Sequence, residues 1–141
     1  MINVTVQRDI PVPASNAWDL LADFGDISWA PGLEKVEVSG EGVGMVRSIF
    51  MPGAPPIEER LEALEHDKMR LEYTIPAGLP MPVSNYRAQA QVVATGRDQC
   101  RIDWSCTAHE EGVSPQEADA IVTGFYEQLL DWIGAELYRR R

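Results

Sequence analysis

The sequence is poor in the residues that cross-link proteins or bind metals. It contains 2 cysteines and 2 histidines in 141 residues. Cys100 and Cys106 lie in one predicted strand about 20 Å apart at ~3.3 Å per residue, whereas a disulfide needs Cα atoms within about 7 Å. His66 and His109 have no metal-ligand spacing to cysteines or carboxylates. We therefore expect no disulfide, no metal site and no cofactor.

Long apolar runs and basic charge are also scarce. No window approaches the ~18 apolar residues of a membrane helix, and the N-terminus lacks the charged start of a signal peptide. The 12 basic residues are outnumbered by 22 acidic ones, which gives a formal charge of −10. Such a surface repels phosphate backbones and anionic lipid headgroups. We expect a cytoplasmic protein with no nucleic-acid partner and no integral membrane association.

The composition that is present is that of one folded domain. Apolar residues make up 45% of the chain and charged residues 24%, which argues against disorder. A chain of this length buries roughly two-thirds of its unfolded surface. There is no internal repeat or linker, so residues 1–141 are predicted to form a single domain.

Hydrophobic periodicity predicts a strand, a helix, six further strands and a closing helix. Proline ends the first strand, and the following helix leads into a second, short helical turn at 27–31. The loops between the later strands are short, which favours an antiparallel meander. The predicted strands are 2–10, 34–39, 43–51, 57–64, 69–75, 83–95 and 100–109, and the first helix is 14–24.

The closing helix has a clear start signal. Ser114, Pro115 and Glu117 form a capping box with proline at the first helical position. The helix continues to Tyr138, which gives roughly 36 Å at 1.5 Å per residue. Its apolar stripe would cover the concave face of a curved sheet, which makes the fold class α+β. The stripe contains Ala118, Ile121, Val122, Phe125, Leu129, Ile133 and Leu137.

Two charged residues interrupt the predicted inner face of the sheet. Glu59 alternates with apolar neighbours, including Ala63, and Arg47 does so on the preceding strand. A turn centred near Ala54 would place Arg47 almost opposite Glu59. Two compatible interpretations follow: a cross-strand ion pair beneath the sheet, or a glutamate that hydrogen-bonds a ligand or water in a cavity.

The other inward residues mix wide aromatic and small side chains, which is typical of an apolar pocket with a few polar anchors. A tightly packed core, in which each tyrosine hydroxyl has an internal partner, is the alternative. The proline- and glycine-rich loops 52–56 and 76–82 either cover a cavity mouth or are ordinary hairpin loops. The predicted ligand-binding residues are Ile49, Met51, Ile57, Glu59, Leu61, Tyr73, Ile75, Leu79, Met81, Tyr86, Ala88, Trp104, Val122, Phe125, Tyr126 and Leu129.

A series of short motifs runs in order through nearly the whole chain. They are Ala17-Trp18 with Leu20-Leu21, Phe24-Gly25, Trp29, Pro31-Gly32, Gly44 with Arg47, Glu59-Arg60-Leu61, Tyr73 with Ile75, Asn85-Tyr86-Arg87-Ala88 and Trp104-Ser105. In this order they resemble the START-like (SRPBCC) superfamily, and especially its polyketide cyclase/dehydrase-like branch. The resemblance implies a helix-grip fold: a seven-stranded curved antiparallel sheet, two short helices after the first strand, and a long C-terminal helix over an apolar cavity.

Two of these segments, Glu59-Arg60-Leu61 and Asn85-Tyr86, also look like those of plant abscisic acid receptors. The resemblance implies that Glu59 and Tyr86 line a ligand pocket and that the loops 52–56 and 78–82 lie where those receptors have gating loops. Neither gate motif is present, and Ala30 stands where the receptors have the lysine that meets the hormone's carboxylate. A hormone-like acid is therefore not the ligand that we expect.

Three functions remain open from the sequence. The leading hypothesis is a carrier or sensor that encloses a mostly apolar small molecule, lipid-, polyketide- or isoprenoid-like, with Glu59 and Tyr86 orienting its polar groups. The alternative is a cyclase or dehydratase, with Glu59 as general base and Tyr86 as acid, which requires a Glu59 that is not tightly paired. The third is an interaction module that acts through the outer face of the sheet or as a homodimer.

Overall fold

The computed structural model describes residues 1–141 and contains seven strands and two helices. Most of the predicted elements are present, with ends that differ from the prediction by at most three residues. In chain order they are β1 (Ile2–Ile10), α1 (Ala14–Ala22), β2 (Lys35–Ser39), β3 (Val46–Phe50), β4 (Ile57–Glu65), β5 (Arg70–Ala77), β6 (Val83–Gly96), β7 (Gln99–Glu110) and α2 (Pro115–Arg140).

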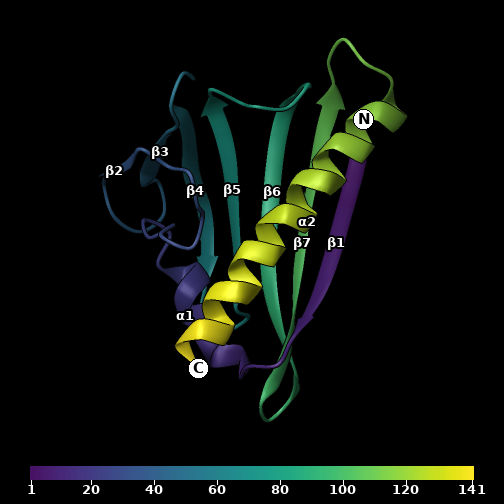
Figure 1. Cartoon of the computed structure of the whole chain (residues 1–141). Helices are drawn as coiled ribbons and strands as arrows, with labels where there is room; N and C mark the ends of the chain where they lie inside the picture. The colour runs from purple at the N-terminus through teal and green to yellow at the C-terminus, as the bar shows by residue number, and fades with distance from the viewer.

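The strands form one antiparallel sheet in the order β1-β7-β6-β5-β4-β3-β2. Consecutive strands pair as a meander from β2 to β7, and β1 adds to the free edge of β7. Figure 1 shows α2 lying obliquely across one face of this sheet, with its C-terminal end near α1. The predicted fold, a curved antiparallel sheet covered by a long C-terminal helix, is therefore confirmed.

The N-terminus of α2 is fixed by the cap that its sequence predicts, and its middle is held to β1 by ion pairs. The Ser114 hydroxyl accepts a hydrogen bond from the Glu117 amide at 3.1 Å, and Pro115 occupies the first turn. Arg8 of β1 donates to Glu127 at 2.8 Å and to Asp131 at 2.6 Å, both on α2. The helix backbone accordingly lies closest to β1 and β7, at one side of the sheet.

Only one short helix follows the first strand, so the prediction of two was wrong. Residues 27–31 make a turn, in which the Ala30 amide donates to the Ile27 carbonyl at 2.9 Å. Pro31 cannot donate a backbone hydrogen bond and disfavours helical geometry at Ala30. The turn therefore cannot extend, and the chain continues toward β2 without regular structure.

A β-bulge in β4 overturns the predicted direction of Ala63. Leu61 pairs with Tyr73, but the next pair is Ala63 with Glu72, so Glu62 is an extra residue. One extra residue reverses the alternation of faces beyond it. Leu64 instead of Ala63 therefore packs against the core.

The buried face of α2 also differs from the predicted stripe. Ile121 and Phe125 are 45% and 39% exposed, so their assignment to the buried face was wrong. Because α2 packs toward β1 and β7, the contact face is rotated to include Tyr126 and Leu130. Neither helix combines the length and apolarity of a membrane span. The buried α2 residues are Ala118, Val122, Tyr126, Leu129, Leu130, Ile133 and Leu137.

Candidate functional site

A cavity of about 140 Å³ lies between α2 and the half of the sheet that the helix backbone does not approach closely. Strands β3, β4, β5 and β6 supply its floor, and the segment between α1 and β2 supplies one wall. Of its 18 lining residues, 14 are hydrophobic. They are Ile27, Trp29, Ala30, Pro31, Leu33, Arg47, Ile49, Met51, Ile57, Glu59, Tyr73, Ile75, Pro80, Met81, Tyr86, Phe125, Leu129 and Trp132.

The structure brings most of the predicted site residues together around this cavity. The predicted residues that line it are Ile49, Met51, Ile57, Glu59, Tyr73, Ile75, Met81, Tyr86, Phe125 and Leu129. Phe125 reaches it from the edge of α2, which explains why this residue is both partly exposed and part of the lining.

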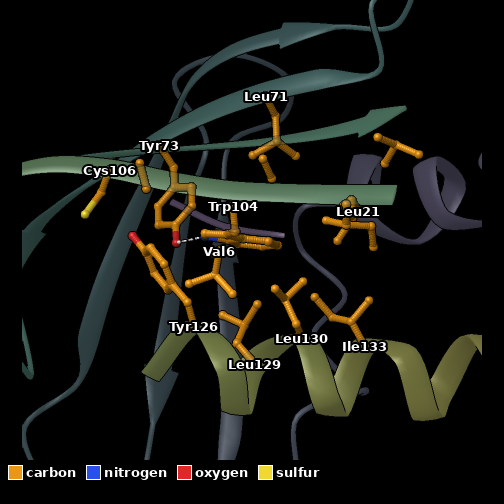
Figure 2. Close-up of a cluster of buried hydrophobic side chains, with 14 of the residues drawn as sticks. Val6, Leu21, Leu71, Tyr73, Trp104, Cys106, Tyr126, Leu129, Leu130 and Ile133 are labelled. Atoms are coloured by element: carbon orange, nitrogen blue, oxygen red, sulfur yellow. Dashed lines mark hydrogen bonds between the residues drawn. The ribbon is translucent and has the colours of Figure 1, made fainter. Parts of the chain in front are cut away.

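Six predicted residues do not line the cavity. Leu79 is half-buried and packs against the core from the β5–β6 loop. The other five belong to the solid part of the interior, on the side where α2 packs closely. Figure 2 shows this part, with Tyr126, Leu129 and Leu130 of α2 directed toward Tyr73 and Trp104 of the sheet and Ile133 directed toward Leu21 of α1. The five core residues are Leu61, Ala88, Trp104, Val122 and Tyr126.

Several lining residues were missed in the sequence. Five of them, Ile27, Trp29, Ala30, Pro31 and Leu33, come from the irregular segment before β2, where no periodicity shows the direction of a side chain. Trp132 had a usable signal, because it lies three residues after Leu129 on the same side of the helix. Pro80 and Arg47 were recognised as notable residues but were not placed in the lining.

Arg47 and Glu59 form the only charged pair of the lining. They are opposite each other in the β3–β4 register, and Arg47 Nε donates to Glu59 Oε1 at 2.7 Å. Arg47 Nη1 also donates to the Phe24 carbonyl at 2.7 Å, and its guanidinium lies 3.8 Å from the centre of the Phe24 ring. The two residues are 7% and 8% exposed, so the predicted cross-strand ion pair is present and buried.

Each partner of this pair retains a polar atom without a protein hydrogen bond. Arg47 Nη2 has no acceptor and Glu59 Oε2 has no donor. Neither atom is completely enclosed by the protein. Because both residues line the cavity, these two atoms are the candidates for hydrogen bonds to a polar group bound there.

A chain of hydroxyl groups lies beside the ion pair. Trp104 Nε1 donates to the Tyr73 hydroxyl at 3.1 Å, as the dashed line in Figure 2 shows, and Tyr73 and Tyr86 hydroxyls are 3.4 Å apart. The Tyr86 hydroxyl in turn bonds to that of Tyr126. Burial raises the pKa of all three tyrosines above the ordinary value of 10.0, so these hydroxyls resist ionisation at alkaline pH. An internal partner for each hydroxyl and an apolar cavity therefore coexist.

The two proline- and glycine-rich loops meet at the end of the sheet nearest the cavity. Gly78 has a positive φ of 74°, and a Cβ there would lie 2.1 Å from the Pro56 carbonyl oxygen. Only glycine permits this approach of the two backbones. Pro80 and Met81 follow immediately and line the cavity, so this contact positions one of its walls.

The sheet, the oblique helix and the cavity between them define a helix-grip protein of the START-like (SRPBCC) class. Residues 1–137 match the family described as polyketide cyclase/dehydrase and lipid transport, and the chain belongs to that family. No curated protein matches the sequence at a significant level.

Solved structures agree with this assignment. An uncharacterized protein from Bacillus thuringiensis is similar with a TM-score of 0.86 at 27% identity, over 97% of this chain and 99% of the other. The protein XoxI from Bacillus cereus has a TM-score of 0.86 at 26% identity, over 98% and 96%. Norcoclaurine synthase from Thalictrum flavum, in complex with dopamine and hydroxybenzaldehyde, has a TM-score of 0.77 at 24% identity, over 99% and 88%. At that identity the plant enzyme shows the fold alone.

Proposed function

We propose that this protein binds a small, mostly apolar molecule in the cavity between α2 and strands β3–β6, as a carrier or sensor. The observation that supports this proposal is the cavity itself, about 140 Å³ with 14 hydrophobic residues among the 18 that line it. An engineered protein cavity of about 150 Å³ lined by apolar side chains binds benzene. Space of this size and polarity is therefore sufficient for a ligand.

The affinity that such a site can reach is limited by the size of the ligand. Small ligands gain roughly 0.5–1 kcal/mol per non-hydrogen atom, so a molecule of about eight such atoms would bind with a Kd between roughly millimolar and micromolar. Binding assays therefore need ligand concentrations up to the millimolar range. Trp29 and Trp132 line the cavity and provide a fluorescence signal for its occupation.

The proposal is tested with purified protein and a variant whose cavity is filled. Native mass spectrometry would detect a co-purified ligand, and a panel of small aromatic molecules should raise the melting temperature, since ligands that bind the folded state stabilise it. Ala30→Leu adds volume to the lining and should abolish the effect of ligand. Ala120→Leu makes the same change on the exposed face of α2 and should preserve it. A panel without any effect on wild-type stability or fluorescence would contradict the proposal.

Catalysis of a cyclisation or dehydration, with Glu59 as general base and Tyr86 as acid, is the alternative function. It is less well supported because Arg47 already binds Glu59 Oε1 at 2.7 Å. Burial also raises the pKa of Tyr86, which makes its hydroxyl a weaker acid. Turnover of a polyketide-like substrate that is lost in Glu59→Gln, with ligand binding retained, would establish the alternative.

A further inference from the structure

The charge balance of the cavity restricts the ligands that it can hold. Arg47 and Glu59 are the only charged residues among its 18 lining residues, and they neutralise each other. A carboxylate or ammonium group of a ligand would move from water into the cavity without gaining a counter-ion there. Burying an unpaired charge in this way is strongly unfavourable. A bound carboxylate would also be close to the Glu59 carboxylate. The site therefore favours a ligand without net charge.

The unused hydrogen-bonding atoms specify the polar group of that ligand. Tyr73 and Tyr86 already bond to each other, and their other partners are Trp104 and Tyr126. The ion pair, by contrast, retains Arg47 Nη2 as a donor and Glu59 Oε2 as an acceptor. A hydroxyl or a primary amide complements both atoms, because each of these groups accepts one hydrogen bond and donates another. A pure hydrocarbon would cover the two atoms and leave them without partners.

The volume of the cavity sets the size of the apolar part. About 140 Å³ accommodates one six-membered ring with a short substituent, by comparison with the cavity of about 150 Å³ that binds benzene. A long acyl chain needs several times this volume. The side chains that face the ring include Trp29 and Trp132, whose flat surfaces suit an aromatic partner.

We propose that the ligand is a neutral, single-ring molecule with a hydroxyl or primary amide group, and that the Arg47–Glu59 pair selects it by hydrogen-bonding this group. The inference rests on the proposed ligand-binding function and names the class of molecule for the same cavity. The pair is thus a specificity determinant of the site as well as a cross-strand contact.

Five probes of similar size test this proposal by calorimetry on the wild-type protein. Benzyl alcohol and benzamide should bind about tenfold or more tightly than toluene, because a hydrogen bond to a charged group adds at least that factor. Benzoate and benzylammonium, which carry a charge on the same ring, should not bind measurably. Decanol, added as a long-chain comparison, should bind more weakly than benzyl alcohol.

Two variants should shift the selectivity toward different ligands, one toward an anion and the other toward a hydrocarbon. Glu59→Gln keeps the shape of the side chain but leaves the Arg47 charge without its counter-ion, so benzoate should now bind and benzyl alcohol should lose its advantage. The double variant Arg47→Met with Glu59→Leu removes both charges and is expected to fold even if the single variant does not. In this double variant toluene should bind at least as tightly as benzyl alcohol.

The outcomes separate this inference from the proposed function. Equal binding of toluene and benzyl alcohol to the wild type would overturn the role of the ion pair, and so would a preference for benzoate or benzylammonium. Tighter binding of decanol would overturn the assigned size. Each of these results still requires that a probe binds in the cavity, so the proposed function would stand. Absence of binding for every probe, in the wild type and the double variant alike, would overturn the proposed function together with the inference.

Discussion

Replacing the two residues of the buried ion pair, singly and together, should give strongly non-additive losses of stability. Removing one partner leaves the other buried without a counter-ion, which costs about 3–5 kcal/mol. Arg47→Met should be the more harmful change, because it also removes the donor to the Phe24 carbonyl at 2.7 Å and the cation that lies over the Phe24 ring. Glu59→Leu retains both contacts of Arg47 and should fall near the lower value.

The double variant Arg47→Met with Glu59→Leu should recover most of this loss. Apolar replacement of both partners leaves no buried charge and is often neutral or stabilising. We expect the free energy of unfolding to lie within about 2 kcal/mol of the wild-type value, since the Phe24 carbonyl still loses its donor. The double variant would then lose at least about 4 kcal/mol less than the sum of the single variants, which double-mutant analysis measures directly.

Urea unfolding followed by circular dichroism provides the assay. With a slope of roughly 2 kcal/mol per molar urea, each single variant should unfold at a midpoint about 1.5–2.5 M below that of the wild type. Lys35→Met at the exposed Lys35–Glu37 pair is a matched control, and it should cost no more than about 1 kcal/mol. If the double variant lost as much as the two single variants added together, Arg47 and Glu59 would not be energetically coupled, and the interpretation of the pair would be wrong.

Three further predictions concern the loops and the dependence of stability on pH. Gly78→Ala should destabilise the protein by about 1–3 kcal/mol and weaken ligand binding, since the added Cβ would collide with the Pro56 carbonyl. Gly53→Ala is the control, because Gly53 also has a positive φ but has open space around it. An equal loss of stability in the control would show that contact between the loops is unimportant. Hydrogen bonds from Thr74 and Arg60 lower the pKa of Glu62, so the stability that Glu62 contributes is present above pH about 4.5 and is lost as the pH falls through the lowered value. Glu62→Gln should therefore reduce the loss of stability at acid pH that urea unfolding measures, and an unchanged loss would contradict the assignment. Burial raises the pKa of Tyr86 and Tyr126 in the folded state, so stability should decline as the pH rises above about 10, where tyrosines of the unfolded chain ionise. Absorbance of these tyrosinates at a pH well below that of unfolding would show that the hydroxyls are accessible and would contradict this prediction.

The elements that the sequence predicted best are those whose faces differ clearly in polarity. Strands β6 and β7 have one apolar and one polar face along nearly their whole length, and the direction of Trp104 followed from alternation alone. The opposition of Arg47 and Glu59 was predictable for the same reason, since it depended only on the position of one turn. In these regions local pattern and tertiary packing agree.

The predictions failed where packing decides the geometry. A bulge leaves no simple signal in a strand as polar as β4, so the direction of Ala63 could not be predicted. On α2, Phe125 and Tyr126 are adjacent and both aromatic, and tertiary contacts of Tyr126 with Tyr86 and Trp104 determine which of them is buried. The wall of the cavity around Trp29 lies in an irregular segment, and its side-chain directions depend on the sheet against which it packs.

The position of the cavity follows from the asymmetric packing of α2. The helix is drawn toward β1 and β7 by the bonds from Arg8 to Glu127 and Asp131 and by its buried apolar face. Tyr126 adds a contact with the sheet, because its hydroxyl bonds to that of Tyr86 of β6. The space that remains lies over β3 to β6, and the Arg47–Glu59 pair of β3 and β4 is part of its lining.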